Sequence, residues 1–101
     1  VMWGAVGTAP IVYFIQAGPG GPIKIGYSSR SGAARLRENQ TAQAETLILL
    51  AEARGTREDE AALHGQFNHR RVRGEWFENC TEIQDLIAYL QDGGTLRSYL
   101  G

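Results

Sequence analysis

The sequence predicts an α+β fold, in which a small antiparallel or mixed β-sheet is flanked by helices in the order β-β-α-β-α-(β)-α. Three observations support this prediction. Two short apolar runs flank a turn rich in glycine and proline, a third apolar run follows a polar helical segment, and two later segments carry apolar residues at helical spacing. A chain of 101 residues can bury one hydrophobic core, so these elements should form a single unit.

The first two apolar runs should form a β-hairpin. Residues 11–16 are almost continuously apolar, which is typical of a strand buried on both faces. Residues 17–22, Ala-Gly-Pro-Gly-Gly-Pro, favour a turn, and residues 23–27 follow as the second strand. Along this second strand the side chains alternate between two faces, with Ile23 and Ile25 on one and Lys24 and Gly26 on the other.

A helix, a strand and a second helix should come next. The polar loop at residues 28–31 can supply an N-cap for a helix over residues 33–40. Residues 46–51 are apolar and predict a third strand. Residues 56–59, Thr-Arg-Glu-Asp, resemble a capping box with acidic residues in the first helical turn, and the helix that they begin should end near Phe67.

The last part of the chain should pack back onto this unit. Residues 69–74 predict a basic connector, and residues 75–77, Glu-Trp-Phe, a short bulky segment whose two aromatic side chains belong to the core. Thr81, together with Gln84, predicts the cap of a last helix over residues 83–90, which Gly93-Gly94 ends. A short tail should dock on the core through Leu96, Tyr99 and Leu100. The predicted organisation is an irregular lead-in at residues 1–10, one domain at residues 11–90 and a C-terminal tail at residues 91–101.

The composition limits the partners of this domain. The net charge is −1, so the protein has no global field that attracts nucleic acid or membranes, and a polyanion must be bound by a local patch. The single cysteine, Cys80, excludes an intrachain disulfide and a cysteine-only metal site and favours a reducing, intracellular compartment. No apolar stretch is long enough to span a bilayer, and we expect no membrane association.

Glu60 is the first candidate functional residue, because it lies on the helical stripe that should be buried. It shares this stripe with Leu63, His64 and Phe67. A carboxylate there is costly unless a cation meets it. That cation could be a divalent metal or, in a purely structural site, the guanidinium of Arg35.

The hairpin supplies proton-handling side chains. Tyr13, Lys24 and Tyr27 can all donate hydrogen bonds, and the turn should gather them. Each also has a structural interpretation. Tyr13 could be a core residue whose hydroxyl binds a backbone carbonyl, Lys24 a solvated edge lysine, and Tyr27 a surface aromatic residue at the end of its strand.

Several cationic side chains could bind a phosphate. Arg35 lies at the margin of its helix's packing face and can meet a phosphate through two donors. Further predicted nucleic-acid contacts are Arg30, Arg70, Arg71 and Arg73, although the last three could equally form a solvated loop. His64 and His69 lack the further ligands that zinc needs, and the hairpin glycines do not form a phosphate-cradling loop between a strand and a helix.

In this order, the candidate residues resemble the motifs of the GIY-YIG endonuclease superfamily, and most closely its phage and meiotically up-regulated branch. Ile11-Val12-Tyr13 corresponds to GIY, Lys24-Ile25-Gly26 to YIG, and Arg35-Leu36 to the arginine helix. Residues 60–67 match the branch's E-x-x-L-H-x-x-F helix and residues 74–77 its G-E-W-F signature. The resemblance covers residues 11–87. It departs from the superfamily at Lys24, which stands in place of a motif tyrosine.

The resemblance implies a nuclease that cuts one DNA strand with a single Mg²⁺ or Mn²⁺ ion. It implies that Glu60 binds the metal, that Arg35 stabilises the charged phosphoryl group, and that Tyr13 orients or deprotonates the attacking water. Lys24 and Tyr27 would assist Tyr13, and His64 and Glu75 would be accessory. Asn68 or Asn79 could replace the asparagine that many members carry after the metal-binding glutamate.

Two other functions compete with a DNA endonuclease or nicking domain. One is an inactive nucleic-acid-binding module of the same fold. The other is a protein-interaction domain in which Arg35 and Glu60 form a structural ion pair. Because so small a domain has little surface for reading bases, specificity should come from a fused domain or a homo-oligomer.

Overall fold

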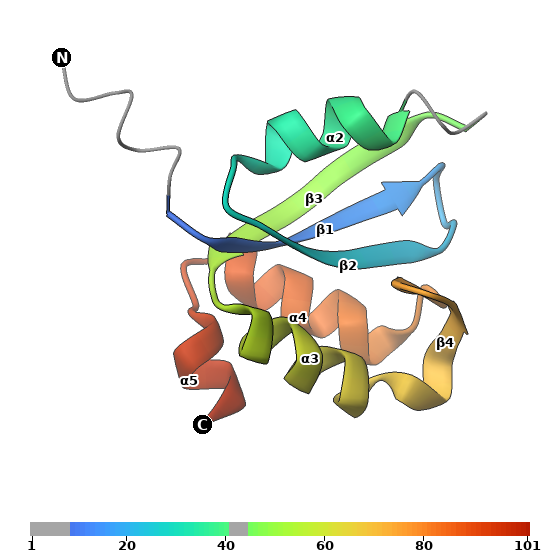
Figure 1. The fold of residues 1–101 in the computed structure, drawn as a ribbon. Helices are drawn as coiled ribbons and strands as arrows, with labels where there is room; N and C mark the ends of the chain where they lie inside the picture. Colours follow the sequence, from blue (N-terminus) through green and yellow to red (C-terminus); the bar gives the residue numbers. More distant parts are fainter. Residues whose placement is uncertain (1–8, 41–44) are drawn as a thin grey trace, which may run out of the picture.

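The computed structural model describes residues 9–40 and 45–101, so the predicted lead-in lies outside the described residues up to residue 8. The predicted α+β fold is confirmed for the described residues: one five-stranded antiparallel sheet and four α-helices. Helix α2 covers one face of the sheet, and α3, α4 and α5 cover the other (Figure 1). None of the described helices is both long and apolar enough to cross a membrane.

The centre of the sheet is the predicted hairpin. Strand β1 spans Ile11–Ala17 and pairs antiparallel with β2, Ile23–Ser28, on one side and with β3, Leu47–Arg54, on the other. The turn closes through a hydrogen bond from the Ala17 N–H to the Pro22 carbonyl (3.0 Å). As predicted, all side chains of β1 up to Gln16 are buried.

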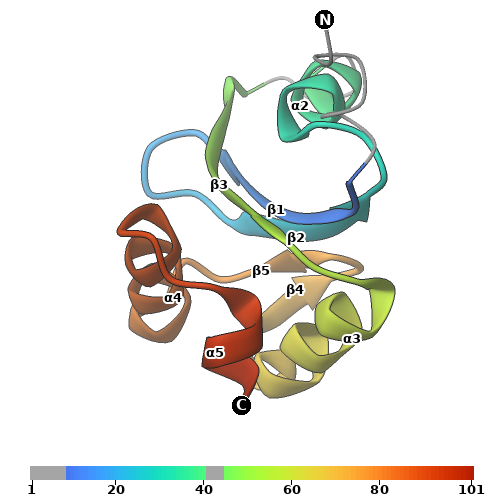
Figure 2. The same cartoon turned by 90° about the vertical axis from the view of Figure 1, so that its left-hand side faces the viewer.

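The alternation along β1 divides the core into two clusters. Val12 and Phe14 join the larger cluster beneath α3 and α4, whereas Ile11, Tyr13 and Ile15 form a smaller cluster on the α2 face. Figure 2 shows the resulting layers, with α2 alone on one side of the curved sheet and the remaining helices on the other. Residues that pair across two strands project to the same face, so this division also assigns the faces of β2.

The first two described helices are held by the predicted polar contacts and by one that the sequence did not predict. Helix α2, Gly32–Gln40, starts after Ser31, whose hydroxyl accepts a hydrogen bond from the Ala34 N–H (3.2 Å). In addition, a carboxylate oxygen of Glu52 in β3 accepts from the Gly32 N–H (2.7 Å), which fixes the start of α2 over the sheet. Helix α3, Arg57–Gln66, begins with the predicted capping box of Thr56 and Asp59.

The segment between α3 and α4 differs from the prediction. The basic connector contains a 3₁₀ turn, Asn68–Arg70, and a short strand β4, Arg71–Arg73, at the edge of the sheet. It pairs with β5, Trp76–Phe77, and Gly74 turns the chain with a φ of 54°. All three residues of β4 are exposed, so the strand carries no apolar pattern that could have predicted it.

The C-terminal region contains two further corrections. Helix α4, Thr81–Gln91, has Cys80 rather than Thr81 at its N-cap, and the Cys80 side chain makes no capping hydrogen bond. Gly93 follows the end of α4 with a φ of 97°, as expected of a glycine after a helix. The tail docks through Leu96 as predicted, but it forms a further helix, α5, Leu96–Leu100, with Thr95 as its N-cap.

Candidate active site

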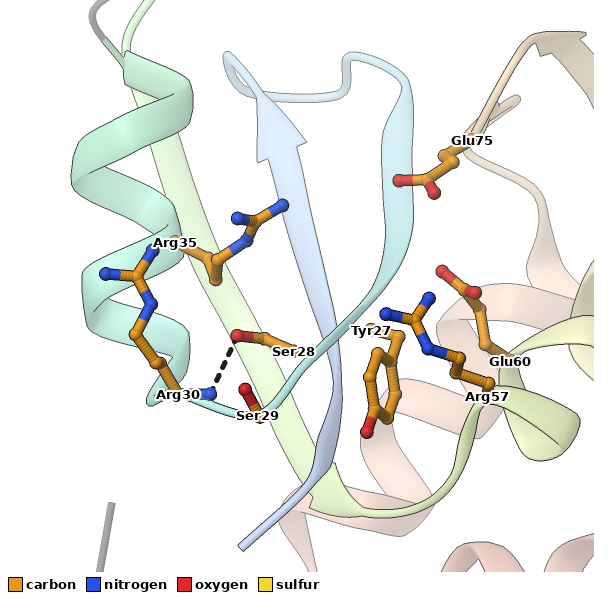
Figure 3. Close-up of a pocket in the computed structure, with 8 residues that line it drawn as sticks. All are labelled: Tyr27, Ser28, Ser29, Arg30, Arg35, Arg57, Glu60 and Glu75. Carbon is orange, nitrogen blue, oxygen red and sulfur yellow. Dashed lines mark hydrogen bonds between the residues drawn. The ribbon is translucent and has the colours of Figure 1, made fainter. Parts of the chain in front are cut away.

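A polar cavity of about 290 Å³ lies beside the free edge of β2. Strand β5 pairs with β2 only at Ile23 and Lys24, so the sheet stops short of the second half of β2 on this side. Helices α2 and α3 flank the open edge, and Figure 3 shows their side chains reaching toward it. The lining residues are Tyr27, Ser28, Ser29, Arg30, Arg35, Arg57, Glu60 and Glu75.

Glu60 carries the most unusual environment in this cavity. Its side chain is 14% exposed, and its Oε2 atom is buried without a hydrogen-bond partner. Burial raises the pKa of Glu60, and the nearby charge of Glu75 raises this pKa further, against the opposing effects of His64 and Arg57. The site therefore holds a carboxylate with one oxygen that makes no hydrogen bond, and its charged form is disfavoured first by burial and then by a second carboxylate.

The structural alternative for Glu60 was an ion pair with Arg35, and this alternative is wrong. Among the ion pairs of the described residues, Arg35 pairs with Glu38 (2.9 Å), and Glu60 pairs only with His64, at 3.9 Å. Arg35 instead packs over the Tyr13 ring, with its Cζ atom 6.0 Å from the ring centroid. The Tyr13 hydroxyl and the Glu38 carboxylate raise the pKa of Arg35 against the effect of burial, so its guanidinium stays charged.

Tyr13 does not line the cavity. Its side chain is fully buried, and its hydroxyl lies close enough to the Arg35 guanidinium to raise the pKa of Arg35 but makes no well-formed hydrogen bond among the described residues. The backbone carbonyl partner considered from the sequence is therefore absent. The ring contacts both the Arg35 guanidinium and the backbone of Gly26 in β2. A Cβ atom added at Gly26 would overlap the Cζ atom and the hydroxyl oxygen of Tyr13.

Lys24 is held on the same face of the sheet as Tyr13. Its ammonium donates to Asn39 Oδ1 at 2.7 Å and lies 3.8 Å from a Glu75 oxygen and 6.0 Å from the Tyr13 ring centroid. The Lys24 side chain is only 14% exposed, so the interpretation as a solvated edge lysine is wrong. Asn39 was missed from the sequence because its contact depends on how α2 crosses the sheet.

The hairpin does not gather both tyrosines, contrary to the prediction. Tyr27 pairs with Val12, which faces α3, whereas Tyr13 pairs with Gly26 and faces α2. The Tyr27 ring instead meets Arg57, whose Cζ atom lies 4.6 Å from the ring centroid. Arg57 was also missed, although its position three residues before Glu60 on α3 could have indicated that it shares that face of the helix.

His64 connects α3 to the edge of β2. Its Nε2 atom lies 2.8 Å from the Ile25 carbonyl, and its ring packs against Phe77 with centroids 5.1 Å apart. The Ile25 N–H donates to the Glu75 carbonyl at 3.0 Å. Both backbone groups of Ile25 are thus bound, and these contacts fix Glu60 and Glu75 beside the open part of β2.

Of the predicted nucleic-acid contacts, only Arg30 lines the cavity. Its guanidinium pairs with Glu38. Arg70 lies near Glu78 (3.5 Å) and Glu82 (3.7 Å) and does not line the cavity. Arg71 donates to Asn68 and Gly74, and Arg73 borders a different cavity beside Trp76.

The structure brings neither asparagine candidate to the cavity. Asn68 accepts from Arg71 (3.0 Å), and Asn79 contacts Gly20 and Gln84. The carboxylates that line this cavity, and could bind a cation there, are those of Glu60 and Glu75. No group of three or more His, Cys, Asp or Glu side chains suited to a metal occurs among residues 9–40 and 45–101. Two carboxylates, one with a free buried oxygen, still fit a cation such as Mg²⁺, which takes its other ligands from water and substrate phosphate.

Comparison with known families places most of the chain in one family. The model of the T5orf172 domain matches residues 10–91, a span that contains all five described strands and the helices α2, α3 and α4. No curated protein and no solved structure matches the chain significantly.

Proposed function

The chain belongs to the T5orf172 domain family, which is associated with nuclease-like activity, and on this premise we propose that it is a metal-dependent DNA endonuclease or nicking domain of the GIY-YIG type. It would hydrolyse one phosphodiester bond at a time, so a double-strand break would need a second copy or a second binding event. Its sequence specificity would come from a fused domain or from oligomerisation.

The observation that carries this proposal is the Glu60 carboxylate. A module that only bound phosphate would gain nothing from a buried, partly unpaired anion in its binding cavity, because the anion repels the ligand. A hydrolase gains a cation-binding group from it. Arg35 reaches the same cavity from α2, which supplies a fixed positive charge opposite the two carboxylates.

Glu60 and Glu75 would hold the Mg²⁺ or Mn²⁺ ion. When bound, this ion would polarise the phosphate and lower the pKa of a coordinated water. In the free protein, repulsion from Glu75 raises the pKa of Glu60. A bound cation would remove this repulsion by neutralising both carboxylates.

Arg35 and Tyr13 would act on the phosphate and on the attacking water. Arg35 would bind the phosphate oxygens through its guanidinium, which carries a full charge at every relevant pH. Tyr13 would take or orient the water proton, and the positive charges of Lys24 and Arg35 lie near its ring. The Tyr13 hydroxyl is buried in the free protein, so this role requires the groups around it to move when the substrate binds.

The test is cleavage of supercoiled plasmid in Mg²⁺ or Mn²⁺ by the wild type and by Glu60→Gln and Arg35→Ala. The expected result is relaxed plasmid from the wild type and a loss of at least about a hundredfold in each variant. Glu58→Gln is the matched control, because Glu58 is an exposed acid on the same helix and does not line the cavity. Cleavage by Glu60→Gln at the wild-type rate would contradict the proposal.

An inactive nucleic-acid-binding module is the second candidate, and the covered hydroxyl of Tyr13 favours it. This candidate predicts a gel shift by the wild type without cleavage in either metal. The shift would persist in Glu60→Gln and weaken in Arg35→Ala. A wild type without affinity for DNA at low salt would exclude both candidates.

A further inference from the structure

We propose that Arg57 is a second phosphate-binding residue of this site, and that Tyr27 supports it through the face of its ring rather than through its hydroxyl. This inference rests on the proposed function, because it takes the phosphate of a DNA strand as the ligand. It gives Tyr27 a different role from the proton handling that the hairpin pattern suggested.

The Arg57 guanidinium is held against an aromatic ring and forms no ion pair among the described residues. It is the first residue of α3, it lines the cavity, and its Cζ atom lies 4.6 Å from the Tyr27 ring centroid. None of the ion pairs among the described residues includes Arg57. A guanidinium stacked on an aromatic face keeps its N–H groups at its edge available, and these groups match the oxygens of a phosphate.

Tyr27 is suited to be the platform for this guanidinium. Its ring lies on the α3 face of the sheet, where the register of β2 against Val12 places it. Figure 3 shows its hydroxyl directed away from the carboxylates of Glu60 and Glu75. The ring face, and not the hydroxyl, is therefore the part of Tyr27 that meets the charged groups of the cavity.

The position of Arg57 also offsets the negative charge of the two carboxylates in the cavity. Glu60 and Glu75 together would repel a polyanionic strand on the α3 side. Arg57 lies one helical turn before Glu60 and is close enough to affect the titration of that carboxylate. Arg35 from α2 and Arg57 from α3 thus border the open edge of β2 from opposite sides, and a phosphate in the cavity would lie between two guanidinium groups (Figure 3).

Two measurements on purified variants test this inference. The first is the dissociation constant for a short DNA duplex over a range of salt concentrations, in EDTA so that no cleavage occurs. The second is single-turnover cleavage in Mg²⁺ or Mn²⁺. The variants are Arg57→Ala, Arg57→Lys, Tyr27→Phe and Tyr27→Ala, and Arg97→Ala is the control because Arg97 borders other cavities, near the C-terminus.

The salt slope is the slope of the logarithm of the binding constant against the logarithm of the salt concentration. Removing one phosphate contact should lower its magnitude by about 0.9 for duplex DNA. We therefore expect this decrease in Arg57→Ala and a cleavage rate at least about tenfold below the wild type, with no decrease of the slope in Arg97→Ala. Tyr27→Ala should resemble Arg57→Ala, and Tyr27→Phe should retain several times the activity of Tyr27→Ala, because it keeps the ring. Arg57→Lys should restore the salt slope but not the full rate, because an ammonium keeps the charge without the planar stacked geometry.

The outcomes separate this inference from the proposed function. A wild-type salt slope in Arg57→Ala would overturn the role of Arg57, whether or not the wild type cleaves DNA. Equal losses in Tyr27→Phe and Tyr27→Ala would overturn the ring role and assign the function to the hydroxyl. Binding without cleavage by the wild type would overturn the nuclease alone, and the salt slopes would still decide whether Arg57 meets a phosphate. A wild type that does not bind DNA would overturn both.

Discussion

The ring of Tyr13 lies directly against the backbone of Gly26, on the α2 face of the hairpin. The two residues pair across β1 and β2, and a Cβ atom at residue 26 would overlap the Cζ and hydroxyl oxygen of Tyr13. Gly26 has no positive φ, so the absence of a side chain, and not backbone freedom, is what this position requires. The tyrosine of the first motif and the glycine of the second therefore form one packing unit beneath Arg35.

Gly26→Ala should destabilise the protein by about 1–3 kcal/mol, because the added methyl group must displace the Tyr13 ring or the β2 backbone in a fully packed core. Urea denaturation followed by tryptophan fluorescence measures this loss. The matched control is Gly65→Ala in α3, where the new Cβ meets no atom within 4 Å. That substitution should stabilise the protein by about 0.5–1 kcal/mol, since alanine loses less backbone entropy than glycine in a helix. A neutral Gly26→Ala would show that Tyr13 moves freely.

Tyr13→Phe should separate stability from activity. The hydroxyl is buried and makes no well-formed hydrogen bond, so its removal should leave the free energy of unfolding unchanged or raise it by about 1 kcal/mol. If Tyr13 handles the water proton, the same variant should lose about a hundredfold or more in single-turnover cleavage. Stability comes from urea denaturation and activity from plasmid relaxation. A variant that is strongly destabilised would show that the hydroxyl has a partner in solution.

The elements with a strong apolar period were predictable from the sequence, and the exposed or very short ones were not. Strands β1 to β3 and helices α2 and α3 follow their patterns within a few residues. Strand β4 consists of exposed Arg-Val-Arg and forms only because Gly74 turns it back onto β5. Helix α5 has five residues, too few for a helical period, and is held by the burial of Leu96.

The residues of the site were predictable as a set, but their faces were only partly so. The alternation that placed Ile23 and Ile25 together also places Tyr27 with them, and that extension would have separated Tyr27 from Tyr13. Arg57 could have been found by helical spacing from Glu60. The contact between Lys24 and Asn39 could not, because it depends on the angle at which α2 crosses the sheet, which a single sequence does not encode locally.

Lys24 and Asn39 should be energetically coupled. The Lys24 ammonium donates to Asn39 Oδ1 at 2.7 Å, and the Asn39 amide donates to the Arg35 carbonyl at 2.8 Å. A double-mutant cycle with Lys24→Met and Asn39→Ala should give a coupling free energy of about 1–2 kcal/mol, measured by urea denaturation. The same cycle with Asn68→Ala is the control, because Asn68 binds Arg71 instead of Lys24, and it should be additive. Additivity of Lys24 and Asn39 would show that their contact contributes nothing.

The stability of the metal-free protein should depend on the protonation of Glu60. Burial and the charge of Glu75 raise the pKa of Glu60 in the folded state, so the folded protein binds this proton more tightly than the unfolded chain does. Protonation of Glu60 therefore adds to the free energy of unfolding at low pH. This stabilisation is lost as the pH rises from the ordinary carboxyl pKa through the raised pKa of Glu60. Glu60→Gln should remove this component and be more stable than the wild type at pH 7.5 in EDTA. Thermal unfolding at a series of pH values checks this. A larger stability gain from the variant at acidic pH than at pH 7.5 would contradict it.

Divalent metal should reverse this destabilisation, which allows metal binding to be measured without DNA. Mg²⁺ or Mn²⁺ at ten times its Kd should add about 1.4 kcal/mol at pH 7.5 and raise Tm by roughly 7 °C, because it binds the folded carboxylates and not the unfolded chain. The rise should shrink at acidic pH, where protons compete for Glu60. It should vanish in Glu60→Gln and persist in Glu58→Gln, whose side chain lies on the same helix outside the cavity. An equal rise of Tm in Glu60→Gln would place the metal elsewhere and leave the free oxygen of Glu60 without a cation to bind.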